Sequence, residues 1–361
     1  MKGRVIALHD DGHAALIVDG RVEDLLLAAD DTPRPGEIWQ ATLDRPIPGQ
    51  NAAFVRIGAH QGYLRDIKGM KGQRRFPVQV AGLPEPGKAI PVERRLLLKG
   101  RALILTPGAP GVNISRQIRD PEVRTRLEAI TAPDEDTGII IRSAARDLPD
   151  AVLHAELAHL TRQLGALDGL DGCHAAATPW AVALREWTGD PVEMIAVSDG
   201  TVRDMAAAAS LPLFGCDPGL QARLTPGDGD PFDHFGVWEE VDHLKGARAD
   251  LPSGGWMAIE ATRAMVTVDV NTGDQFGQGA GMTASVEAAR ELPRQLRLRG
   301  LGGQLIVDFA PIKKMHRRRI EETLKTAFRR DPIATTLAGW TPLGNFELQR
   351  KRERRPLAEH L

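Results

Sequence analysis

The sequence predicts an α+β protein of several domains, and three observations lead to this class. Its 361 residues, 42% of them hydrophobic, are enough for a substantial core divided over two or more domains. Short runs rich in β-branched residues, separated by Pro and Gly, dominate the first quarter of the chain and predict strands. Residues 265–309 instead read as strand, Gly-rich loop, helix and strand, a unit whose two strands can lie side by side.

The elements follow in order along the chain. Residues 1–34 alternate apolar runs with Asp and Gly, a hairpin pattern with too little core to stand alone. Residues 35–95 contain several short runs between Pro and Gly, which predicts a small barrel of the OB type. Residues 96–183 mix strands with a helix, and residues 184–245 return to short strands and a helix. Within that segment, the acidic stretch of residues 228–243 is expected to be a solvated loop.

Composition limits the classes of function. There is no apolar run long enough for a membrane and no secretory leader, so a cytoplasmic protein without a membrane partner is expected. The two cysteines, Cys173 and Cys216, predict neither a disulfide framework nor a cysteine zinc site. From Leu251 onward 18 Lys and Arg face 12 Asp and Glu, a charge of +6, whereas the rest carries −8. This asymmetry favours an anionic partner, with a solvated helix face as the alternative.

Asp269 and Asp308 stand at or near the ends of the two strand-like runs. If those strands are neighbours, the two carboxylates come together although they are 39 positions apart. Ionised carboxylates repel and are costly to desolvate, so the pair predicts a cation, and all-oxygen ligands indicate Mg²⁺ or Mn²⁺ rather than zinc. Asn271 points to the same face and can orient a carboxylate or a metal-bound water. Spacing alone leaves an equal alternative, in which one Asp is a cap and the other pairs with an arginine.

Basic residues are dense around these acids. Acids at a focus among many cations suit a metal-dependent enzyme that acts on a polyanion. The basic residues are Arg290, Arg294, Arg297 and Arg299 on or just after the predicted helix, and Lys313, Lys314, Arg317, Arg318 and Arg319 after the second strand.

The segments LPSGGWMAIEATRAMVTVDVNTG and VEAARELPRQLRLRGLGGQLIVDF resemble the catalytic region of the ribonuclease E/G family, and weaker similarity extends over almost the whole chain. The resemblance implies that Asp269 and Asp308 bind the catalytic Mg²⁺, with Mn²⁺ as a substitute, and that Asn271 supports them. It also implies four parts: a split ribonuclease-H-like structural subdomain (residues 1–34 plus 184–245), an inserted OB-type RNA-binding barrel (35–95), a 5′-sensor-like region (96–183) and a C-terminal DNase-I-like catalytic domain (246–361).

Phe54 and Tyr63 are candidates for RNA contact. An aromatic ring offers a face on which any base can stack, although a single aromatic in a strand more often belongs to the barrel core. AAFVRIG followed by GYL resembles the family's RNA-binding barrel, which implies that both rings stack on bases. Looser alignment adds Lys88, and the match of ELQRKR to the family's EMSRQR adds Arg350, for which a disordered basic tail is the alternative. Nearby basic residues would attract the RNA backbone: Lys68, Lys71, Arg74 and Arg75.

Arg142 and Ser143 end the strand-like run TGIII. An arginine fork beside a hydroxyl suits a phosphate, although an ordinary surface arginine gives the same pattern. The run resembles the family's IVRT, which implies a pocket that senses the RNA 5′-monophosphate, here with Ser143 in place of Thr. The segment NISRQIRD resembles the loop that feeds this pocket, which makes Arg116 a further candidate.

These observations predict a Mg²⁺-dependent endoribonuclease that cleaves single-stranded RNA during processing or decay, leaving 5′-phosphate and 3′-hydroxyl ends. Three departures from the family stand out: the loop of residues 272–283 is short and weakly charged, Pro293 lies within the helix and should kink it, and no cysteine zinc-link follows. Zinc is therefore not expected, and a homodimer is left open. The alternative is a non-catalytic RNA-binding or regulatory protein of the same fold. A nucleotide-binding enzyme is a weaker rival, because the phosphate-loop spacings are absent.

Overall fold

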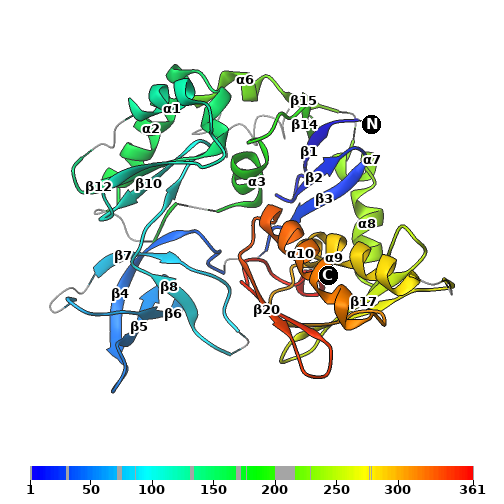
Figure 1. The fold of residues 1–361 in the computed structure, drawn as a ribbon. Coiled ribbons are helices and arrows are strands. Elements are labelled where there is room, and N and C mark those ends of the chain that lie inside the picture. Colours follow the sequence, from blue (N-terminus) through cyan, green and yellow to red (C-terminus); the bar gives the residue numbers. More distant parts are fainter. Residues whose placement is uncertain are drawn as a thin grey trace. The chain divides into compact units, whose positions relative to one another are not determined.

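A computed structural model describes residues 2–29, 32–70, 75–85, 87–130, 134–167, 172–175, 177–199, 216–227, 229–275, 277 and 279–360. The chain divides into two compact units, one of Met1–Val22 and Leu26–Phe235, the other of Glu23–Leu25 and Gly236–Leu361. Each unit mixes helices and strands (Figure 1), which confirms the α+β class. Within the described residues, no helix has the length and apolar character needed to cross a bilayer.

The first sheet joins the start of the chain to strands near residue 200. Its order is β15-β14-β1-β2-β3; β1 is antiparallel to β2 and parallel to β14, which is parallel to β15. Helix α3 packs Trp180, Leu184 and Trp187 against apolar residues of β1 and β2. The elements are β1 (Arg4–Leu8), β2 (Ala14–Val18), β3 (Arg21–Leu26), α3 (Pro179–Trp187), β14 (Met194–Val197), α6 (Pro218–Gln221), β15 (Leu224–Pro226) and α7 (Pro231–His234).

The barrel is closed and has five strands, as the pattern of residues 35–95 predicts. The strands run in the order β4-β5-β6-β8-β7, and β7 pairs back onto β4. Inward-pointing residues such as Val55, Leu64 and Val78 are fully buried and form its core. The strands are β4 (Ile38–Pro46), β5 (Ala52–Ile57), β6 (His60–Arg65), β7 (Arg75–Val80) and β8 (Ile90–Glu93), with β13 (Cys173–Ala175) added to β4.

A four-stranded sheet, β11-β12-β10-β9, follows the barrel. Helix α2 covers it, and Leu153 and Leu160 of this helix share a core with Leu103, Leu105 and Ile139 of the strands. The elements are β9 (Leu98–Lys99), β10 (Leu103–Pro107), β11 (Gly111–Ile114), α1 (Pro121–Glu128), β12 (Thr137–Ile141), η1 (Ser143–Asp147) and α2 (Asp150–Gly165).

The second unit is a six-stranded sheet, β16-β17-β18-β19-β21-β20, with helices on one face. β18 and β19 are parallel neighbours joined by α9, which runs without interruption through Pro293, and the other neighbouring strands are antiparallel. The predicted strand–loop–helix–strand unit is therefore confirmed. The elements are α8 (Val237–Leu244), β16 (Arg248–Asp250), β17 (Trp256–Ala261), β18 (Val266–Asn271), α9 (Ala280–Leu298), β19 (Gly303–Asp308), η2 (Lys314–His316), α10 (Arg317–Arg330), β20 (Thr335–Trp340), β21 (Phe346–Arg350) and η3 (Leu357–Glu359).

The acidic stretch of residues 228–243 is helical where the structure describes it, so the prediction of a solvated loop is wrong. The Asp230 side chain accepts from the Phe232 amide at the start of α7, and Pro231 takes the first helical position, a combination typical of helix starts. Phe232 is fully buried. In α8, Glu240 pairs with Arg294 of α9 at 2.8 Å, which ties α8 to the second unit.

Candidate active site

The crossover through α9 brings two aspartates together at the carboxyl ends of β18 and β19. Asp269 is the register partner of Asp308 in this parallel pair, and neighbouring strands lie about 4.8 Å apart. Register partners point to the same face of a sheet, and both residues are exposed. The predicted juxtaposition of these two acids is therefore confirmed.

Asn271 completes the group from the end of β18. It lies two residues beyond Asp269, and its Nδ2 donates a hydrogen bond to Asp269 Oδ2 at 2.8 Å. Carboxylate and amide oxygens are the ligands that Mg²⁺ and Mn²⁺ prefer, and a cation would offset the repulsion between the two carboxylates. The donor set therefore fits a divalent cation held by Asp269 and Asp308, with Asn271 orienting Asp269.

The two faces of the sheet differ in the way such a site requires. Met257, Val268 and Val307 point to the face covered by α9 and α10 and are buried in the core of the unit. The residues that alternate with them, including the two aspartates, point to the opposite face and are exposed or half-buried. We call this surface the open face. A large polyanionic ligand can approach the acid pair from it.

Two glycine-containing turns support the end of the sheet beside Asn271. A Cβ on Gly255 would lie 2.6 Å from the Asn271 backbone oxygen, and one on Gly273, which has φ +59°, would lie 2.3 Å from the Gly254 oxygen. Only glycine allows so close an approach of two backbones. Ser253 anchors the first turn, donating to Glu287 of α9 from its amide at 3.0 Å and its hydroxyl at 2.8 Å.

Only some of the basic residues that were expected around the acids are exposed enough to face a substrate. Arg294 contacts Glu291 and Glu240, and Arg297 contacts Asp331 at 2.5 Å. Arg294, Arg297 and Arg299 have little exposed surface, so they stabilise the second unit rather than face a substrate, which corrects the prediction for this helix. After β19, Lys313 and Lys314 are exposed and lie close along the chain to Asp308. Three further basic residues of the second unit are exposed: Arg290, Arg318 and Arg319.

Arg350 occupies a different environment from the one expected of an RNA contact. It is 1% exposed, forms an ion pair with Asp331 at 3.0 Å and donates to the Thr335 hydroxyl at 2.9 Å. The side chain therefore cannot reach a phosphate without leaving this pair, and the prediction of an RNA contact by Arg350 is at odds with the structure. The exposed basic neighbour is Lys351, which pairs with Glu353 at 2.9 Å.

The barrel displays its two aromatic rings outward. Phe54 and Tyr63 are register partners on β5 and β6, half-buried, with ring centroids 6.2 Å apart. They alternate with the buried core residues, so they are not barrel core. The sequence reading missed Arg45 and Arg65, whose guanidinium carbons lie 5.4 Å from the Phe54 ring and 5.9 Å from the Tyr63 ring. Arg65 follows Tyr63 by two positions, the strand spacing that puts both on one face.

The other basic candidates of the barrel have mixed positions. Lys88 is exposed and pairs with Glu85 in the loop before β8. Lys68 and Arg75 are exposed as well. Lys71 and Arg74 lie outside the described residues.

Arg142, Ser143 and Arg116 gather at one end of the four-stranded sheet. β11 and β12 are parallel, and the Ser115 amide donates to the Ile141 oxygen at 2.8 Å, so the residues that follow both strands share an edge. The Arg142 guanidinium pairs with Glu186 at 2.5 Å and donates to the Gly100 oxygen at 3.0 Å. Burial would raise the pKa of the Glu186 carboxyl, but Arg142 and Arg185 outweigh it and hold that pKa below its usual value.

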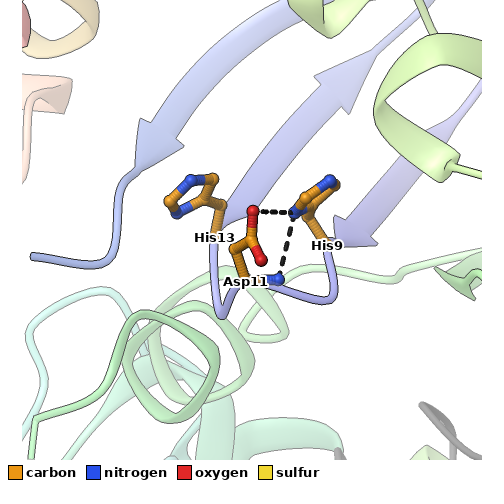
Figure 2. Close-up of side chains that lie close together, drawn as sticks. All are labelled: His9, Asp11 and His13. Carbon is orange, nitrogen blue, oxygen red and sulfur yellow. Dashed lines mark hydrogen bonds and ion pairs between the residues drawn. The ribbon is translucent and has the colours of Figure 1, made fainter. Parts of the chain in front are cut away.

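A histidine cluster lies at the turn between β1 and β2 (Figure 2). His9 and His13 stack with ring centroids 5.5 Å apart, and Asp11 lies between them in the turn. The ring Nδ1 atoms already accept backbone hydrogen bonds, His9 from the Asp11 amide at 3.1 Å and His13 from the Ala28 amide at 2.9 Å. A metal at these two Nδ1 atoms would have to displace both hydrogen bonds, so these bonds favour a structural role in holding the turn.

The fold and the acid pair first define a class: a multidomain α+β protein with a two-carboxylate site and a barrel of a kind that binds nucleic acids. The model of the Ribonuclease E/G family matches residues 97–353, and the chain belongs to this family. Ribonuclease G of Salmonella typhimurium is 30% identical over 370 residues, which cover 90% of this chain and 74% of that protein. Ribonuclease G of Escherichia coli K12 is 29% identical over the same shares, and Ribonuclease E of Nostoc is 27% identical over 98% of this chain and 56% of that protein.

Proposed function

We propose that this protein is a Mg²⁺-dependent endoribonuclease that cleaves single-stranded RNA in RNA processing or decay. The observation that carries the proposal is the register pairing of Asp269 with Asp308 on an open sheet face, with Asn271 bonded to the first of them. Family membership and the names of the relatives, Ribonuclease G and Ribonuclease E, support the reaction class.

The roles follow from the positions of the side chains. Asp269 and Asp308 would hold the cation, and the Asn271 amide keeps the Asp269 carboxylate turned toward it. A bound Mg²⁺ would lower the pKa of a water ligand and offset negative charge on the scissile phosphate. In the hydrolysis, the water oxygen bonds to phosphorus, the bond from phosphorus to O3′ breaks, and O3′ takes up a proton. The products carry a 5′-phosphate and a 3′-hydroxyl.

Binding of single-stranded RNA is assigned to the aromatic pair of the barrel. Phe54 and Tyr63 present ring faces that can stack on unpaired bases of any sequence, and Arg45 and Arg65 beside them add positive charge for the backbone. We expect Lys88 and the exposed Lys313 to attract phosphates at longer range. Duplex RNA, whose bases are already stacked, should be a poor substrate.

Recognition of a 5′-monophosphate is assigned to Arg142, Ser143 and Arg116. Arg142 can turn from Glu186 to a phosphate, the Ser143 hydroxyl supplies a donor, and Arg116 is exposed at the same edge. RNA with a 5′-monophosphate should therefore be cleaved faster than the same RNA with a 5′-hydroxyl, and Arg142→Gln should remove the difference.

The experiment is cleavage of a single-stranded, 5′-monophosphorylated RNA with and without Mg²⁺, by the parent and by Asp269→Asn and Asp308→Asn. Asp274→Asn is the matched control, because it makes the same change at an exposed acid outside the strand ends. We expect Mg²⁺-dependent cleavage by the parent and the control, and RNA binding without cleavage by the two variants. RNA binding without cleavage by the parent, in Mg²⁺ and in Mn²⁺, would instead establish the non-catalytic RNA-binding alternative.

A further inference from the structure

An indole lies beside the acid pair on the open face. Trp256, the first residue of β17, is the antiparallel register partner of Asn271, the residue that bonds to Asp269. Side chains of register partners have Cβ atoms about 4.5–5.5 Å apart, and diagonal neighbours such as Trp256 and Asp269 are about 7–8 Å apart. The ring is therefore within one diagonal step of Asp269, and Asp308 is the register partner of Asp269 on the next strand.

This indole does not belong to the core beneath the sheet. On β17 the alternation puts Met257 and Ile259 into the core with α9 and α10, whereas Trp256 is half-buried and points the other way. The next residue on its face is Ala258, the register partner of Asp269. Because alanine is short, it leaves room on the sheet between the indole and the carboxylates.

Arg248 of β16 lies against the indole and places a positive charge beside it. Its guanidinium carbon lies 5.0 Å from the Trp256 ring centroid, and its side chain is 61% exposed. The Nε atom donates to Asp250 at 2.7 Å, and Asp250 is the register partner of Trp256. A flat apolar ring flanked by a guanidinium is the combination with which proteins bind unpaired bases, since the ring stacks on the base and the cation attracts the phosphate.

We propose that Trp256 and Arg248 form a subsite for one unpaired nucleobase next to the bond that is cleaved. The base stacks on the indole while its neighbouring phosphate lies at Asp269 and Asp308. This inference rests on the proposed nuclease function, and it places a requirement for an unpaired base at the cleavage site itself, in addition to the barrel. A nucleotide held in a duplex cannot offer its base to this ring.

The test uses single-stranded RNAs with one preferred cleavage site, each with one abasic ribonucleotide at a successive position around that site. We measure kcat/KM for the parent, Trp256→Phe and Trp256→Leu. For the parent and Trp256→Phe, the abasic nucleotide at one position beside the cleaved bond should lower kcat/KM by about 5- to 150-fold. Trp256→Leu should lose a similar factor on intact RNA and become insensitive at that position. Phe54→Leu, a control on the barrel, should keep the position-specific loss.

The subsite proposal is overturned if Trp256→Leu, shown by circular dichroism to be folded, cleaves intact RNA as the parent does or keeps the parent's sensitivity at each position. Should the leucine variant unfold, Arg248→Gln replaces it, because Arg248 is an exposed side chain. This variant should lose the parent's sensitivity to the abasic nucleotide at the same position. A second readout needs no cleavage. In Asp308→Asn protein, 2-aminopurine placed in turn at each of these positions should change fluorescence on binding at one of them, and Trp256→Leu should abolish that change. This result decides whether Trp256 stacks on a base even where the parent fails to cleave RNA.

Discussion

Removal of the Arg350 guanidinium should unfold the second unit more readily without weakening RNA binding directly. Arg350 and Asp331 have fully buried side chains, and Asp331 also accepts from Arg297 and from the Ile333 amide at 2.9 Å. Burial lowers the pKa of the Arg350 guanidinium, and Asp331 opposes that shift. Breaking a buried pair by removing one partner typically costs about 3–5 kcal/mol when the other charge is left uncompensated. Because Arg297 still faces Asp331 in this variant, we expect the lower end of that range, about 3 kcal/mol. The total stability of a domain is only about 5–15 kcal/mol.

The assay compares Arg350→Met with the neighbouring control Lys351→Met. In the first variant, a loss of that size should lower Tm by about 10–20 °C for a unit of this size. Lys351 is 48% exposed and pairs with Glu353, an interaction worth at most about 1 kcal/mol, so the control should melt within a few degrees of the parent. Thermal unfolding is followed by circular dichroism, and RNA affinity is measured well below both midpoints.

The outcome separates the two roles of Arg350 cleanly. A structural role predicts an Arg350→Met protein that melts early yet binds RNA with the parent's affinity while folded. If this variant melts with the parent and binds RNA at least tenfold more weakly, the reasoning from burial is refuted. The RNA contact implied by the resemblance would then be restored.

Two further predictions concern a buried acid and a close backbone contact. Burial raises the pKa of the Glu156 carboxyl above its ordinary value of 4.5, so its contribution to stability is greatest below that pH and is lost as pH rises through the folded-state pKa. Glu156→Gln should therefore gain stability relative to the parent from pH 4 to pH 8 in urea unfolding, and an unchanged difference would contradict this sign. Gly255→Ala should cost about 1–3 kcal/mol, because its Cβ would meet the Asn271 oxygen at 2.6 Å, and should lower kcat more than it changes KM. Gly277→Ala, with open space around its Cβ, is the control, and equal kcat losses in both variants would exclude the contact as the cause.

The second unit was predictable from sequence because its local signals agree. Two β-branched runs around a helical segment predict neighbouring strands, and an aspartate at each strand end then predicts the acid pair. The barrel was predictable for a similar reason, since short runs between Pro and Gly specify its strands. The helical start at Asp230 and Pro231 also had a local signal, the cap followed by proline, but the density of acids led to the prediction of a solvated loop.

Residues whose roles depend on distant partners were not predictable in this way. Arg294, Arg297 and Arg350 are of the residue type that is common on nucleic-acid-binding surfaces. Here, however, they pair with Glu240 and Asp331, which come from other elements of the fold. A count of charges records neither burial nor pairing. For the same reason the outward orientation of Phe54 and Tyr63 required the strand register, because an aromatic in a barrel strand is compatible with either face.

The burial of these arginines follows from where the acid pair has to be. Two adjacent carboxylates cannot be covered by a helix without a large desolvation cost, so they belong on the open face, while α9 packs on the opposite one. The cations of α9 are thereby directed away from the acids and become available for ion pairs that fasten α8 and Asp331 to the unit. Positive charge for the substrate must then come from segments beyond the strand ends and from the open face itself. Lys313 and Arg248 hold such positions, and both are exposed.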